Sequence, residues 1–81
     1  MLHISVISPE ATLFEGDAAS VVAPAHDGEV GILTGHAPML TLLGTGTLRV
    51  GGGPSFTVAG GFLQVVDDQV RVVTEKAAKA P

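Results

Sequence analysis

The sequence contains no cysteine, tryptophan or tyrosine, and only four of its 81 residues are lysine or arginine. Without cysteine there can be no disulfides, thiolate zinc sites or thiol nucleophiles. Three phenylalanines are too few to form a stacking platform for bases or sugars. The basic residues are scattered and the net charge is −4, which argues against nucleic acid because phosphate binding requires clustered Lys and Arg.

Signals for secretion and for membrane insertion are also missing. The first ten residues lack a basic segment and are interrupted by Ser5, Ser8 and Pro9, so they do not have the form of a signal peptide. No apolar run approaches the roughly 20 residues of a membrane helix. Small secreted domains usually carry disulfides, so the lack of cysteine favours a reducing cytoplasm.

Apolar residues are abundant, at 46% of the chain, whereas charged residues make up only 15%. A single domain of this length buries roughly 60–65% of the surface that its unfolded chain exposes. Some apolar side chains should therefore stay on the surface, where they would mark a site for a protein partner.

Short β-prone segments, separated by glycine and proline, run along the chain. They span residues 2–7, 12–15, 20–23, 30–33, 39–43, 47–50, 55–59, 62–66 and 69–74. About ten short strands fit no open sheet of this size, so the sequence predicts one all-β domain over residues 1–81, a flattened two-sheet β-sandwich or barrel. Gly16-Asp17 is expected to end the second strand.

The C-terminal tail has a different composition. Residues 75–80 are strong helix formers, but an isolated helix of this length is not stable. We expect at most a vestigial helical turn there, with residues 76–81 as the point where a helical segment would begin.

One short stretch gathers side chains that could bind a metal or transfer protons, namely His26, Asp27, Glu29 and His36. The alternative is a solvated loop in which Asp27 and its neighbouring glycine set a turn and His36 bonds the loop backbone. The spacing matches no metal motif, so the second interpretation is preferred.

Other candidate sites are weaker still. Phosphate-binding glycine loops need a helix N-terminus behind them, and the glycines at 44–46 and 51–53 flank a strand instead. Asp67-Asp68 is more typical of a hairpin turn than of a carboxylate pair, and no serine has the context of a nucleophile elbow. The sequence predicts no catalytic residues, no metal site and no cofactor.

Residues 28–41 read GEVGILTGHAPMLT. This stretch closely resembles the signature of the epsilon subunit of F-type ATP synthases, which is called delta in mitochondria. Further similarity extends over residues 4–6, 8–9, 13–16, 20–25, 46–50, 59–65 and 70–74, so the resemblance covers essentially the whole chain.

The resemblance implies the N-terminal ten-stranded β-sandwich of a non-catalytic central-stalk subunit. In that family the domain binds the gamma subunit, rests on the c ring and turns with both, which couples ion translocation to ATP synthesis. The implied location is the cytoplasmic face of the bacterial inner membrane, with membrane contact only through the c ring. The coupling ion stays open.

The resemblance also assigns residues. Glu29 matches an acidic position in the family's loop that faces the c ring, where it could pair with a basic residue or serve only as a solubilising charge. Gly28, Gly31 and His36 belong to the same expected loop. A second set is expected to be structural: Gly35, Ala37, Pro38, Gly60 and Gly61. The glycines are expected to have positive φ or to lie close to another chain segment.

Two features depart from the family. Thr34 stands where proline is usual, which predicts a less rigid loop. Typical members continue as two C-terminal helices that restrain ATP hydrolysis, and the sequence predicts that this brake is absent. The alternative from another class is a stand-alone β-sandwich that binds a small ligand or saccharide.

Overall fold

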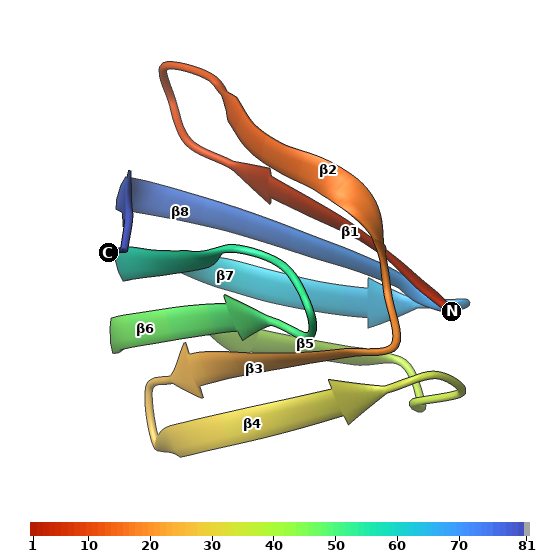
Figure 1. The fold of residues 1–81 in the computed structure, drawn as a ribbon. Coiled ribbons are helices and arrows are strands. Elements are labelled where there is room, and N and C mark those ends of the chain that lie inside the picture. The colour runs from red at the N-terminus through yellow and green to blue at the C-terminus, as the bar shows by residue number, and fades with distance from the viewer. Residues whose placement is uncertain (81) are drawn as a thin grey trace.

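Alternation of apolar and polar residues determines the first strand. In the computed structural model, which describes residues 1–80, Leu2, Ile4 and Val6 are fully buried while His3 and Ser5 point outward. Seven further strands follow along the chain (Figure 1). The eight strands are β1 (Leu2–Ile7), β2 (Thr12–Ala18), β3 (Ser20–Ala25), β4 (Gly28–Leu33), β5 (Met39–Leu42), β6 (Thr45–Val50), β7 (Ser55–Val66) and β8 (Gln69–Lys79). This part of the chain contains no helix that could span a membrane.

The two longest strands, β7 and β8, form a hairpin that belongs to two sheets. The C-terminal half of β7 pairs with β5, and its N-terminal half pairs with β6. The first half of β8 pairs with β1 in parallel, and β1 pairs with β2. We call β2, β1, β8 (69–74), β7 (61–66) and β5 the first sheet. The second sheet consists of β4, β3, β6, β7 (55–59) and β8 (76–79).

The hairpin bends at Gly60 and Gly61, which have φ of +75° and +109°. A Cβ on Gly61 would collide with the carbonyl oxygen of Val73, so only glycine fits where the two strands cross from one sheet to the other. Thr74, opposite Gly61, is buried and its hydroxyl bonds the carbonyl oxygens of Gly60 (3.0 Å) and Lys76 (2.8 Å). At this bend the same strand pair passes from the first sheet into the second and links the two sheets.

The core lies between the two sheets. Its sixteen buried hydrophobic side chains all come from named strands or from Leu43, the residue after β5, and aliphatic residues dominate. The largest fully buried side chains are Leu2, Ile4, Ile32, Leu48, Leu63, Val6, Val21, Val58, Val65, Val70, Val72 and Thr74. Phe14 and Phe56 form a tilted aromatic pair, with ring centroids 6.4 Å apart.

The structure confirms the all-β sandwich, and its open strand order β2-β1-β8-β7-β6-β3-β4 distinguishes it from a closed barrel. Splitting β7 and β8 at their bend gives the expected ten short segments. Two local expectations are wrong. The second strand continues through Gly16-Asp17 because Asp17 pairs with His3, and residues 75–79 extend β8 instead of starting a helix. Pro81, the end of the expected tail, lies outside the described residues.

The tail becomes a strand because β7 offers it a backbone partner. Lys76 pairs with Ala59 and Lys79 with Phe56, so its amide and carbonyl groups enter the second sheet. A helix of five or six residues would have few internal hydrogen bonds with which to compete.

Candidate partner-binding surface

Cross-strand pairing arranges the outward side chains of the first sheet in rows. Directly opposed residues lie on the same face, and successive rows along a strand are about 7 Å apart. One row contains Asp17, His3, Gln69 and Val66. The next contains Glu15, Ser5, Arg71, Gln64 and Leu40. The third contains Ile7, Val73, Phe62 and Leu42.

The third row and the adjoining Leu40 form an apolar patch on the surface, defined here as Ile7, Leu40, Leu42, Phe62 and Val73. Ile7, Phe62 and Val73 are partly buried. Leu40 and Leu42 are 70% and 61% exposed, although both lie in a regular strand. Together with Phe62 they line a hollow of about 410 Å³. Ile7, Phe62 and Val73 contribute to a second hollow of about 460 Å³ beside it. Contiguous exposed apolar side chains of this kind mark protein interaction sites.

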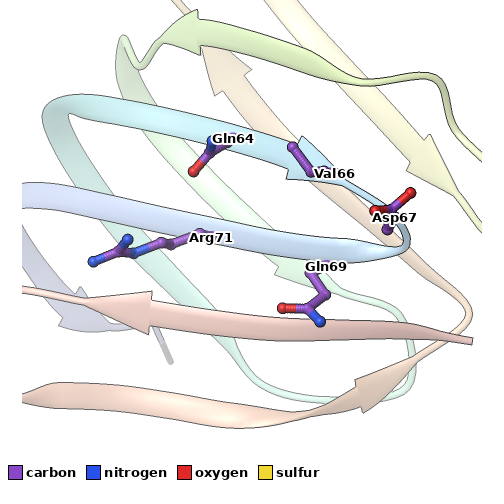
Figure 2. A pocket seen from close by; sticks show the side chains of 5 residues that line it. All are labelled: Gln64, Val66, Asp67, Gln69 and Arg71. Carbon is purple, nitrogen blue, oxygen red and sulfur yellow. The ribbon is translucent and has the colours of Figure 1, made fainter.

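The other rows carry polar groups. Gln64, Val66, Asp67, Gln69 and Arg71 line a hollow of about 380 Å³ near the β7–β8 turn, as Figure 2 shows. The turn itself is made by Asp67 and Asp68, whose positive φ values of 50° and 61° are those of a tight hairpin, as predicted.

At the β2 edge, His3 lies between two carboxylates. Its Nδ1 is 3.0 Å from Oδ1 of Asp17 and its Nε2 is 3.1 Å from Oε2 of Glu15. The hydrogen bond to Asp17, followed by that to Glu15, raises the pKa of His3 above 6.5. This ionic cluster ties the outermost strand of the first sheet to β1.

The residues assigned by the family signature lie elsewhere, on the second sheet. Gly28, Glu29 and Gly31 belong to the edge strand β4 instead of a loop. Glu29 is exposed and its Oε2 is 3.4 Å from Nη2 of Arg49. Gly28 has positive φ, as expected, but Gly31 has neither positive φ nor a neighbour that a Cβ would touch. The expectation for Gly31 is therefore wrong.

His36 lies in the β4–β5 loop with Gly35, Ala37 and Pro38. Its Nδ1 is 2.6 Å from the carbonyl oxygen of Ala37, which agrees with a role in the loop backbone. Gly35 has φ of +85°, and its amide donates a 2.7 Å hydrogen bond to Oδ1 of Asp68 in the β7–β8 turn. This loop therefore lies at the same end of the molecule as that turn and the N-terminus (Figure 1).

The structure separates His36 from the other candidate site residues. Glu29 lies near the start of β4 and His36 follows its end, and a six-residue strand spans roughly 20 Å. His26 and Asp27 form the turn that leads into β4, so they stay with Glu29. Among residues 1–80 no three His, Asp or Glu side chains are arranged to hold a metal ion. The four residues therefore do not form one site.

The composition predicted exposed apolar side chains but not where they lie, and the sequence did not single out Arg71. The one signal for the patch was the short strand Met39–Leu42, in which Leu40 and Leu42 on one face and Met39 on the other are apolar. In a two-layer sandwich only one face of a strand packs on the core. Apolar side chains on the other face are therefore exposed or covered by a partner.

These features define a small two-sheet β-sandwich that leaves an apolar surface exposed on its first sheet. The chain belongs to the family described as ATP synthase, Delta/Epsilon chain, beta-sandwich domain, whose model matches residues 1–80. The resemblance found in the sequence is thereby confirmed.

Individual relatives give the same result. The ATP synthase epsilon chain of Leptospira borgpetersenii serovar Hardjo-bovis is 41% identical over 80 residues, which cover 95% of this chain and 63% of the relative. The ATP synthase epsilon chain of Solibacter usitatus is 45% identical over 82 residues, with coverage of 98% and 61%. The chain thus spans about three fifths of the length of these relatives.

Solved structures show the same fold. A chain in the cryo-EM structure of the Euglena gracilis mitochondrial ATP synthase (OSCP/F1/c-ring, rotational state 1) matches with a TM-score of 0.87 and 25% identity, over 96% of this chain and 52% of that one. A chain in the central stalk/c-ring structure of the Tetrahymena thermophila mitochondrial enzyme matches with a TM-score of 0.79 and 16% identity, over 95% and 65%. At 16% identity the second match shows the fold alone.

Proposed function

We propose that this chain is the β-sandwich of a non-catalytic central-stalk subunit of an F-type ATP synthase, and that it links the gamma subunit to the c ring. The family match over residues 1–80 is the observation that carries the proposal. Relatives named ATP synthase epsilon chain, and a structural match within an F1/c-ring assembly, support it. In this role the domain transmits rotation and has no need of catalytic groups.

The apolar patch is the proposed binding site for the gamma subunit. Leu40 and Leu42 project from a regular strand whose other face packs inward, so their exposure is fixed by the sheet. Covering a leucine side chain contributes about 1.5–3 kcal/mol. Leu40, Leu42 and Phe62 together can therefore supply the apolar centre of an interface.

The c ring is proposed to contact the β3–β4 end, where Glu29 lies. The carboxylate is exposed, and its ion pair with Arg49 is long enough to be exchanged for a basic residue of the ring. An exposed pair of this kind contributes about 1 kcal/mol or less, so Glu29 would position the domain more than hold it. His36 lies at the opposite end of β4, so its proposed role is structural, in the backbone of the β4–β5 loop.

The fold suits a part that transmits torque. The β7–β8 hairpin runs through both sheets, so a force on the first sheet reaches the second through a continuous backbone and its hydrogen bonds. A close-packed core adds resistance to deformation. The resulting location is peripheral, at the membrane surface through the c ring, on the cytoplasmic side of a bacterial membrane.

The direct test is reconstitution. The chain, purified gamma subunit and purified c ring of the same synthase are mixed and separated by size, and we expect this chain to co-purify with gamma and with the gamma–c ring assembly. Failure to bind either component would contradict the proposal, as would ATP hydrolysis by the isolated chain.

A further inference from the structure

Arg71 lies at the centre of the outward face of the first sheet. Its cross-strand neighbours are Ser5 on β1 and Gln64 on β7, so no charged residue adjoins it in its own row. Figure 2 shows its side chain extended along β8 and directed away from Asp67 in the turn. The ion pairs of residues 1–80 are those of His3 with Glu15 and Asp17 and that of Arg49 with Glu29, and none includes Arg71.

The lack of a counter-ion has a structural cause. Glu15 occupies the same row but lies two strands away, roughly 10 Å at the backbone, with the small side chain of Ser5 between. Its carboxylate turns instead to His3, which also takes Asp17. His3 thus pairs with both acidic side chains at the β2 edge, and the guanidinium of Arg71 remains available to an acidic group of a partner.

The surroundings of Arg71 suit a carboxylate supplied by another protein. The carboxamide of Gln64 beside it can donate a further hydrogen bond, and Leu40 completes the row on β5. An arginine guanidinium binds a carboxylate through two parallel hydrogen bonds, which fixes orientation as well as position. In a chain of net charge −4, an unpaired arginine is also a local exception that an acidic partner group can recognise.

We propose that Arg71, assisted by Gln64, binds a carboxylate on the partner segment whose apolar side chains cover Leu40, Leu42 and Phe62. The inference rests on the proposed docking of gamma on the apolar patch and names the polar contact that orients it. The distance between neighbouring rows also indicates the secondary structure of the partner segment. Phe62 and Gln64 are two residues apart on β7, about 7 Å, which is close to the rise of about 6 Å over four helical residues. A partner helix with an apolar residue and an acidic residue four positions apart can therefore contact Phe62 with the first and the Arg71–Gln64 pair with the second.

Binding of purified gamma is measured for the wild type, Arg71→Ala, Arg71→Lys and Leu42→Ser, at about 0.05 and 0.3 M NaCl. Arg49→Ala is the matched control, since it removes the same charge from the other sheet. We expect Arg71→Ala to weaken binding roughly tenfold at low salt and to flatten its salt dependence, with Arg71→Lys intermediate and Arg49→Ala unchanged.

The outcomes separate the two proposals. In one outcome, the wild-type chain binds gamma and Leu42→Ser weakens binding, but Arg71→Ala binds within twofold of the wild type with the same salt dependence. That result would contradict the carboxylate contact and leave the proposed docking surface intact. If gamma does not bind the wild type at all, the proposed function fails and the inference fails with it. Circular dichroism of each variant confirms that a loss of binding is not a loss of fold.

Discussion

Gly61 packs so closely against Val73 that a Cβ at position 61 would collide with the carbonyl oxygen of Val73. The contact occurs where β7 and β8 pass together from one sheet to the other. Together with the positive φ of Gly60, it explains why two consecutive glycines stand in the middle of a twelve-residue strand, where glycine otherwise weakens a sheet.

Gly61→Ala should lower the free energy of unfolding by about 3 kcal/mol or more, because it adds a backbone clash to a positive φ. Gly31→Ala is the matched control. It lies on edge strand β4 with open space around it, and we expect a change within about 0.5 kcal/mol. Urea denaturation of the two variants measures both values, and equal losses would contradict the structure at the bend.

Thr74→Val should destabilise the fold by about 1–2 kcal/mol, since it keeps the side-chain shape but leaves the carbonyl oxygens of Gly60 and Lys76 without their hydroxyl partner. Thr57→Val, at an exposed position of the same hairpin, is the control and should be nearly neutral. If both variants unfold at the same urea concentration as the wild type, the hydroxyl does not stabilise the bend.

The His3 cluster predicts a dependence of stability on pH. Because Asp17 and Glu15 raise the pKa of His3 in the folded state, the protonated ring stabilises the fold fully below about pH 6.5, the unfolded value. That contribution is lost as pH rises through the higher folded-state pKa. The stability difference between wild type and His3→Gln should therefore be larger at about pH 5.5 than at about pH 8.5.

NMR titration of the His3 ring measures its folded-state pKa directly. Its pKa should lie above 6.5 in the wild type and fall in Asp17→Asn, which removes the stronger of the two partners. A wild-type pKa at or below 6.5 would show that the ring does not hold these carboxylates in solution.

Glu29→Lys should weaken association with the c ring by more than it lowers folding stability. The substitution removes one exposed ion pair with Arg49, which stabilises folding by about 1 kcal/mol or less, and reverses the charge offered to the ring. Asp67→Lys makes the same charge change in the β7–β8 turn, at the other end of the molecule. Equal effects of the two variants on ring binding would leave Glu29 without a specific contact.

Much of the fold could be predicted from local sequence. Alternation placed β1 correctly, and Asp67-Asp68 identified the last hairpin, because both depend on residues adjacent in the chain. The tail could not be predicted this way. Its composition favours helix, and only the pairing of residues 76–79 with β7 makes it a strand. Weak local preference yields to a tertiary partner.

The candidate site was less predictable for a related reason. Glu29 and His36 are close in sequence, yet an extended strand holds them at opposite ends of the domain. Leu40 and Phe62, by contrast, are distant in sequence and meet through strand register, which is set by tertiary pairing. A motif shows which residues belong together in a family, whereas the sheet decides which of them share a surface.

The most direct test of the account is the binding of purified gamma subunit to Leu42→Ser and Leu33→Ser, measured by titration calorimetry. Both leucines are similarly exposed, at 61% and 65%, but Leu33 ends β4 on the second sheet and lies outside the apolar patch. We predict that Leu42→Ser weakens binding at least tenfold while Leu33→Ser binds as the wild type does. Equal affinities for the two variants would contradict the docking of gamma on the first sheet.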